Sequence, residues 1–310
     1  MSRSRPRLAG FLTLVLSSFL LVACTAGVGG GSASSNPGST IEPPSPSAPA
    51  GIDHSTGADQ LVLRVDTAGG FVAPGFILTH LPEFSLYGDG RIVVPGPQIE
   101  IYPAPALPSL VEQRVSEAGI QRILEAASAA GLLGPDRHYD AVGIADAGTT
   151  TFTVISGGVR HTVSAYALGI DSQAPQAGPD AAARQLLAAF RDRLSGGTDW
   201  LADAVVEVPA QYAFRAVRVY SDPAQPGQDP NGVEPTHADW PLATPLAAGQ
   251  PAGGGPDTKC TLVEGDGLAA LLPALRSANQ LTIWRSGGSE YQLRLRPLLP
   301  DESGCRSVGG

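Results

Sequence analysis

The densest group of side chains that could bind a metal or move a proton lies between residues 136 and 146. Asp136, His138 and Asp140 alternate along the chain, and Asp146 follows in the same polar stretch. In an extended strand the first three would share one face and offer a metal two oxygens and one nitrogen. Loops of Asp and His are more often simply solvated. We therefore expect an exposed polar loop here, with a metal site as the alternative, and no bound metal or cofactor.

No local motif predicts catalysis. The chain has no Gly-x-Ser-x-Gly, no Ser-x-x-Lys with its partner motifs, no His-Glu-x-x-His and no Gly-rich phosphate loop. The histidines are scattered singly: His54, His80, His138, His161 and His237. We expect no catalytic residue and a protein that is not an enzyme. A hydrolase is the alternative, and it requires a nucleophile within hydrogen-bonding distance of one of these histidines.

Cys24 stands at the end of a typical export signal. Residues 1–7 carry three arginines, and residues 8–23 carry no charge. A helix of those sixteen residues is about 24 Å long, too short for a hydrocarbon core of about 30 Å. The segment is therefore a signal peptide rather than a permanent span.

The four residues Leu21-Val22-Ala23-Cys24 resemble the lipobox of bacterial lipoprotein precursors. The resemblance covers residues 1–24 only. It implies that the Cys24 thiol receives a diacylglyceryl group, that residues 1–23 are removed, and that the protein is anchored on the extracytoplasmic face of the cell membrane. Two or three acyl chains give stable anchoring. The alternative is an ordinary secretory signal with an incidental Cys24.

Two cysteines remain, Cys260 and Cys305, and the signal would export them to an oxidising compartment, where disulfides persist. They lie on either side of the last expected helix and hairpin. We predict that they form a disulfide, because neither has the C-x-x-C spacing of a metal site.

A tether and a folded region follow the signal. Residues 25–58 are mostly Gly, Ser, Pro and Ala, which cannot bury enough apolar surface to offset the entropy of ordering. We expect a disordered tether over 24–58 and a folded domain over 59–310, with halves at 59–197 and 198–310.

The charge balance limits the partners. Removing residues 1–23 leaves 17 basic and 29 acidic residues. A net-acidic chain without a basic cluster is poorly suited to nucleic acid or to electrostatic binding of anionic lipid. We therefore expect no nucleic-acid partner. The expected partners are the membrane, through lipid on Cys24, and an envelope protein, a wall component or an apolar small molecule.

Hydrophobic patterns predict six strands and two helices in the first half. Five of the strands are expected at 61–65, 84–87, 91–94, 149–155 and 160–168. Gly88-Asp89-Gly90 predicts a hairpin turn, with a cation or phosphate loop as the alternative. Between residues 109 and 131 we favour a strand at 110–115 and a helix at 117–130 over one long helix that starts at Ser109. A second helix follows Pro179-Asp180.

The second half is predicted to hold a strand at 214–220, a helix around Leu268–Leu275 that Pro273 kinks or delays, and a hairpin at 281–296. Residues 221–259 have no periodicity and eight prolines. Trp240 is the large apolar residue of this loop. We expect it to anchor the loop on the domain; the alternative is that it forms part of an interaction surface.

These elements predict an α+β fold of antiparallel sheet with a few helices packed on one face. A helix followed by a Gly-Gly hairpin occurs twice, which suggests that the two halves are related. The order of elements, the Arg bias and the tether also resemble those of the secreted lipoproteins that high-GC Gram-positive bacteria encode in numbers. That resemblance implies no activity. We expect a non-enzymatic binding or accessory protein of the cell envelope, with a carrier of lipid or another apolar ligand as the first alternative.

Overall fold

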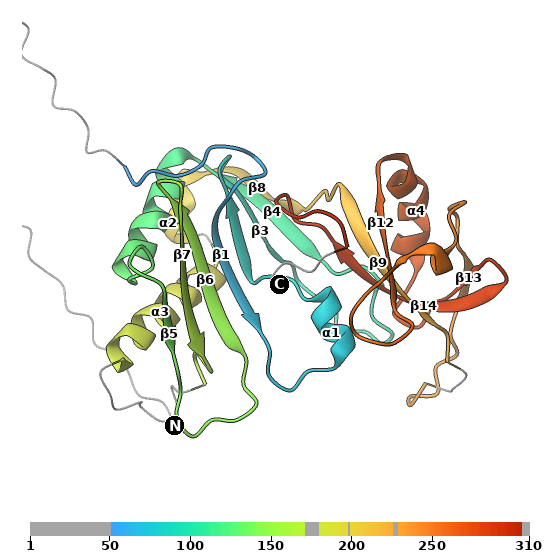
Figure 1. Ribbon diagram of the computed structural model, residues 1–310. Helices are drawn as coiled ribbons and strands as arrows, with labels where there is room; N and C mark the ends of the chain where they lie inside the picture. The colour runs from blue at the N-terminus through green and yellow to red at the C-terminus, as the bar shows by residue number, and fades with distance from the viewer. Residues whose placement is uncertain (1–50, 171–179, 198, 226–228, 306–310) are drawn as a thin grey trace, which may run out of the picture. The chain divides into compact units, whose positions relative to one another are not determined.

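The computed structural model describes residues 51–305 except 171–179, 198 and 226–228. These residues belong to one compact unit, Pro49–Gly310. The α+β fold class is confirmed: there are two sheets, of eight and six strands, and most strand pairs are antiparallel (Figure 1). Residues 1–50, which include the signal segment and Cys24, lie outside the described residues.

The first sheet has the order β5-β7-β6-β1-β2-β3-β4-β8. Its strands are β1 Leu61–Ala68, β2 Phe84–Tyr87, β3 Arg91–Pro95, β4 Leu110–Val115, β5 Arg137–Tyr139, β6 Thr149–Ser156, β7 Val159–Tyr166 and β8 Val205–Gln211. The turn predicted between β2 and β3 is confirmed, because the Gly90 N–H donates to the Tyr87 carbonyl at 3.0 Å and Gly90 has φ +83°. Only β5 pairs in parallel within this sheet, with β7.

Two helices cover one face of the first sheet (Figure 1). α2, Glu117–Ala129, buries Ile120, Ile123 and Leu124, and α3, Ala181–Ser195, buries Leu187, Phe190 and Leu194. A Cβ at Gly119 would lie 2.7 Å from the Cβ of Val115, so glycine allows α2 to approach β4 closely. The short η2, Asp199–Ala204, completes this core with Leu201.

The second sheet has the order β10-β13-β14-β9-β12-β11. Its strands are β9 Ala216–Pro223, β10 His237–Asp239, β11 Gln250–Pro251, β12 Lys259–Glu264, β13 Ile283–Ser286 and β14 Ser289–Pro297. α4, Gly265–Ser277, packs on one face and contains Pro273 in its interior. Two short helices remain, α1 Pro74–Thr79 and η3 Leu246–Ala248. Among the described residues, no helix combines the length and apolar character needed to cross a membrane.

The two halves do not share one strand order. In the first sheet the hairpin β6–β7 joins the central strand β1 through its first strand, β6. In the second sheet the hairpin β13–β14 joins the central strand β9 through its second strand, β14. The similarity of element order therefore does not extend to topology, and the suggested relation between the halves is not supported. The first sheet also continues to Gln211, beyond the expected boundary at residue 197.

The tether was predicted to be several residues too long. Of the residues assigned to it, 51–58 are described, and they lie along the domain. The Gln121 side chain of α2 bonds the backbone of Ile52 at 2.7 and 3.0 Å, and the Asp53 carbonyl accepts from Ser156 and Gly157. Backbone hydrogen bonds order these residues, and the Gly/Ser/Pro composition gave no sign of such partners.

Candidate functional site

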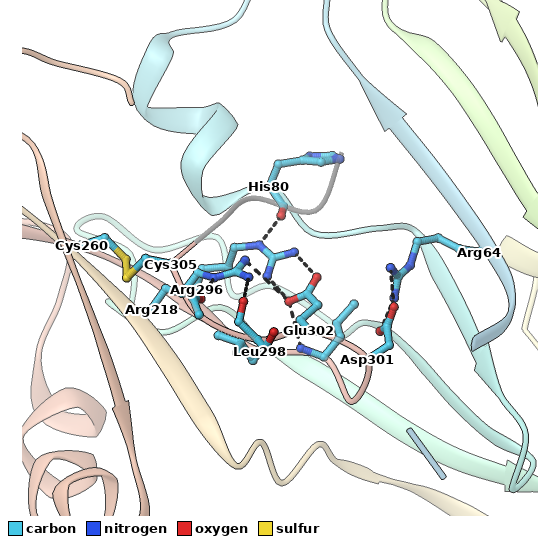
Figure 2. Close-up of polar contacts among 12 residues, drawn as sticks. Arg64, His80, Arg218, Cys260, Arg296, Leu298, Asp301, Glu302 and Cys305 are labelled. Carbon is cyan, nitrogen blue, oxygen red and sulfur yellow. Dashed lines mark hydrogen bonds and ion pairs between the residues drawn. A yellow bond between two sulfur atoms is a disulfide. The ribbon is translucent and has the colours of Figure 1, made fainter. Parts of the chain in front are cut away.

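The C-terminal segment, residues 298–305, lies between the two sheets and is fixed there by buried ion pairs (Figure 2). On the first sheet, Arg64 of β1 donates to both carboxylate oxygens of Asp301 at 2.8 and 3.0 Å. The Tyr87 hydroxyl donates to the same carboxylate at 2.9 Å and accepts from Arg64. Asp301 is thereby bound to two neighbouring strands of the first sheet.

The second sheet holds the adjacent residue, Glu302. Arg296 of β14 donates to both oxygens of this carboxylate, and its Nε donates to the His80 carbonyl at 2.8 Å (Figure 2). Arg218 of β9 donates to the carbonyls of Ser303 and Gly304 at 3.2 and 2.7 Å, and its Nη1 lies 3.8 Å from Glu302. The Glu302 side chain is fully buried, so these guanidinium groups replace the water that would otherwise solvate it.

Burial shifts several pKa values in this junction. Loss of solvent raises the pKa values of the Tyr87 and Tyr212 phenols and lowers the pKa of the Arg218 guanidinium. Tyr212 donates to the Leu298 carbonyl at 2.9 Å. Both carboxylates of the junction are ion-paired with arginines of the two sheets, so the junction has the geometry of a structural clamp.

The disulfide predicted between Cys260 and Cys305 is confirmed, with the two Cα atoms 5.9 Å apart. It joins β12 to the end of the C-terminal segment, one residue after the carbonyl that Arg218 binds (Figure 2). The covalent bond and the ion pairs thus hold the same short segment.

An open groove of about 420 Å³ lies beside the junction. Three elements form its walls: the β3–β4 connection, the β8–β9 connection and α4. The main lining residues are Gln98, Ile99, Leu107, Tyr212, Phe214, Leu272 and Arg276, with Pro97, Pro105 and Pro108 along one wall. Ile99 is 68% exposed at the groove, so an apolar side chain is available there to a partner. Sequence reasoning missed this groove because its walls come from segments far apart in the chain.

Trp240 is buried, with 8% of its surface exposed. Its indole N–H donates to the Thr244 carbonyl at 2.8 Å, and its ring packs edge-on against Trp284 at 6.1 Å. This agrees with the prediction that Trp240 anchors the loop. The alternative, an interaction surface at Trp240, is wrong because the ring lies in the core under α4.

The polar stretch 136–146 begins with the short strand β5, which places His138 beside β7. His138 pairs with Ser164 across β5 and β7, and its Nδ1 lies 2.7 Å from the Ser164 Oγ. Its Nε2 lies 3.0 Å from Asp140, while the Asp136 carboxylate accepts from the Thr162 N–H. The described residues contain no group of three His, Cys, Asp or Glu that could hold a metal.

Ser164, His138 and Asp140 therefore lie in the order nucleophile, base and carboxylate. The sequence could not indicate this arrangement, because the three-residue strand β5 was not predicted. The Asp140 side chain is 82% exposed and that of His138 is 51% exposed. The other described histidines lie beside carboxylates or a carbonyl: His54 beside Glu117, His80 beside Asp66, His237 beside Glu290 and His161 beside Gly134.

The comparisons with known proteins are negative: no protein-family model matches this chain, and no curated protein or solved structure is significantly similar to it. The function must therefore be argued from this molecule alone.

Proposed function

We propose that the protein is a membrane-anchored accessory protein of the cell envelope that binds a segment of a partner protein in its surface groove. Lipid on Cys24 would anchor it. The disulfide between Cys260 and Cys305 supports an extracytoplasmic location, because such bonds persist in oxidising compartments.

The groove is the observation that carries the binding role. It combines apolar side chains, three prolines and the polar ends of Gln98 and Arg276, which suits an extended apolar segment with a few polar groups. The faces of α2, α3 and α4 that meet the sheets carry clusters of buried side chains. A carrier would need an enclosed apolar cavity between sheet and helices, whereas this groove is open, and that favours the protein partner over the carrier.

Anchoring is tested by growing cells with an alkyne-tagged fatty acid and comparing the parent with Cys24→Ser. The parent should carry the tag and sediment with membranes, and the variant should do neither. A tagged Cys24→Ser protein would refute the proposed anchor.

Groove binding is tested in intact cells with a photo-crosslinking residue at Ile99. The matched control has the same residue at Val159, which is 54% exposed and lies away from the groove. We expect a discrete adduct from position 99 that disappears when Leu272→Glu places a charge in the groove. Equal adducts from both positions, or adducts unaffected by Leu272→Glu, would exclude the groove as the site. An extractable lipid or other apolar ligand that co-purifies with the parent but not with Leu272→Glu would instead support the carrier.

The contacts of His138 favour a second candidate function, a hydrolase with Ser164 as nucleophile, His138 as base and Asp140 as the orienting carboxylate. The exposure of Asp140 weighs against it, because water screens the charges that such catalysis uses. A fluorophosphonate probe should label the parent and not Ser164→Ala if this candidate is right. Ser156→Ala, also at a surface hydroxyl, is the control.

A further inference from the structure

Four large apolar side chains, close together in the sequence, are exposed between the end of β1 and α1. They are Phe71, Val72, Phe76 and Ile77, with exposed fractions of 94, 37, 53 and 59%. We call these four residues the end patch. They follow β1 and continue into α1, which lies at the end of the sheet where β1 terminates (Figure 1).

The end patch contributes little to the fold. α1 is fixed through Leu78, which is buried with Tyr220 and Cys260, while Phe76 and Ile77 on the same helix stay more than half exposed. The Phe71 backbone N–H donates to the Asp146 carbonyl at 3.3 Å, but the side chain of Phe71 is almost fully exposed. The Phe76 ring also contacts the His80 ring, with 5.6 Å between centroids, but about half of its surface remains in water. Large apolar side chains that remain so exposed indicate an interaction site.

The size of the end patch distinguishes between possible partners. Added together, the exposed fractions correspond to about two and a half fully exposed residues. Since an aromatic side chain presents about 150–250 Å², the end patch exposes on the order of 450 Å² of apolar surface. A stable protein interface buries about 800 Å² on each side. A bilayer interface accepts a few protruding apolar side chains without requiring a matching shape.

The charges around the end patch also favour a lipid surface over a charged partner. None of its four residues is charged, and two basic side chains near it lie beside carboxylates: His80 is 2.5 Å from Asp66, and Arg294 is 2.5 Å from Asp222. A surface built for phosphate or an acidic polymer would present cations. Contact with lipid at this site must therefore depend on apolar insertion.

The chain is long enough to bring the end patch to the membrane. The described chain begins beside Gln121 and Ser156, at the opposite end of the sheet, and β1 spans eight residues, or about 26 Å. The 26 residues between Cys24 and Gly51 have a maximum reach of about 90 Å. The tether is therefore long enough for lipid on Cys24 and the end patch to contact the same bilayer at once.

We propose that the end patch inserts into the interface of a lipid bilayer and gives the domain a second membrane contact. In the cell this contact acts together with the anchor of the proposed function. The affinity of the end patch for lipid is a property of the folded domain and does not depend on acylation.

The test uses the unlipidated chain of residues 24–310 with Cys24→Ser and phosphatidylcholine vesicles in a sedimentation assay. We expect binding that is unchanged between about 0.05 and 0.5 M salt, because no charge is involved. Phe71→Ser and Phe76→Ser should each weaken it about tenfold or more, the effect of withholding one large apolar side chain from lipid. Val208→Ser, at a residue 78% exposed on β8, should bind like the parent.

A tryptophan at position 71 gives a second readout. In Phe71→Trp, emission should shift to the blue with vesicles and be quenched by brominated lipid. Three results of the vesicle assay would overturn the proposal. In the first, the parent does not bind vesicles; in the second, its binding requires phosphatidylglycerol and disappears with salt; in the third, Phe71→Ser binds as well as the parent. Dimerisation in solution that Phe71→Ser abolishes would also overturn it, since a second copy would then cover the patch. Failed acylation in cells would leave these vesicle results unchanged, so the anchor and the end patch are tested separately.

Discussion

At the scale of single residues, Glu302 is held by charged groups on both central strands of the second sheet, β14 and β9. Its carboxylate is fully buried and accepts hydrogen bonds from both terminal nitrogens of Arg296, and an Arg218 nitrogen lies 3.8 Å away. Removing one member of such a cluster leaves the other charges buried without compensation, whereas the same change on the surface is screened by water.

We predict that Glu302→Gln lowers the free energy of unfolding by about 3–5 kcal/mol. The matched control is Asp203→Asn, which breaks the exposed pair with Arg122 and should leave the urea midpoint unchanged. Urea denaturation followed by tryptophan fluorescence measures both variants. Equal midpoints for the two would mean that the clamp does not contribute to stability.

Tyr212 should make the stability of the folded chain depend on pH in the alkaline range. Burial raises the pKa of its phenol, so below about pH 10 both the folded and the unfolded chain keep the proton and its contribution is complete. Above that pH only the unfolded chain loses the proton, and stability falls as the pH rises, by up to about 1.4 kcal/mol per pH unit. We predict a shallower fall between pH 9 and 11 for Tyr212→Phe, measured by urea denaturation at each pH. The same slope in the parent and the variant would contradict this.

At the scale of elements, Pro273 is an exposed interruption of α4. It is the ninth residue of the helix, supplies no N–H to the turn before it, and lies on the outer face. Proline in a helix interior costs about 3 kcal/mol.

We predict that Pro273→Ala raises the free energy of unfolding by about 1–3 kcal/mol. Pro209→Ala is the control, because Pro209 is equally exposed but lies on the edge strand β8, where there is no helix to repair. Thermal unfolding by circular dichroism compares the two. A lower midpoint for Pro273→Ala would mean that the proline ring contributes packing that its exposure conceals.

Elements with a strong local pattern could be predicted from the sequence. The strand Leu110–Val115 and the start of the helix at Glu117 agree with the structure, because apolar spacing and a turn signal coincide there. The elements that were missed have weak local signals. β5 and β10 have three residues each and pair in parallel with distant strands, and β8 contains Pro209. Their strand conformation comes from pairing partners, which a single sequence does not specify.

At the junction, only the covalent bond between Cys260 and Cys305 could be predicted from the sequence. Two cysteines left over in a chain that is predicted to be exported indicate a disulfide, whatever the fold. Arg64 and Asp301 are 237 residues apart, and neither has a local pattern that marks it as half of a buried pair. Trp240 could be placed as an anchor, because a single large ring in a polar loop gains most by burial.

At the scale of the whole molecule, the C-terminal segment connects the two sheets, and the disulfide closes the segment. Asp301 binds β1, Glu302 binds β14, and Cys305 is bonded to β12. Loss of the disulfide should therefore weaken both sheets, although Cys260 belongs only to the second. The closed chain of 45 residues implies a stabilisation of up to about 4 kcal/mol.

We predict that Cys260→Ser with Cys305→Ser lowers the midpoint of urea unfolding while the chain still unfolds in one transition. Far-UV circular dichroism reports both sheets, and the fluorescence of Trp240 and Trp284 is weighted toward the second. The two signals should shift together, because the ion pairs of Asp301 and Glu302 still couple the sheets when the covalent bond is lost. Adding Glu302→Gln to the same variant weakens that coupling further while Asp301 still binds Arg64, so the midpoint should fall again and the two signals should begin to separate. Separate transitions already in the cysteine double variant would mean that the disulfide alone joins the sheets.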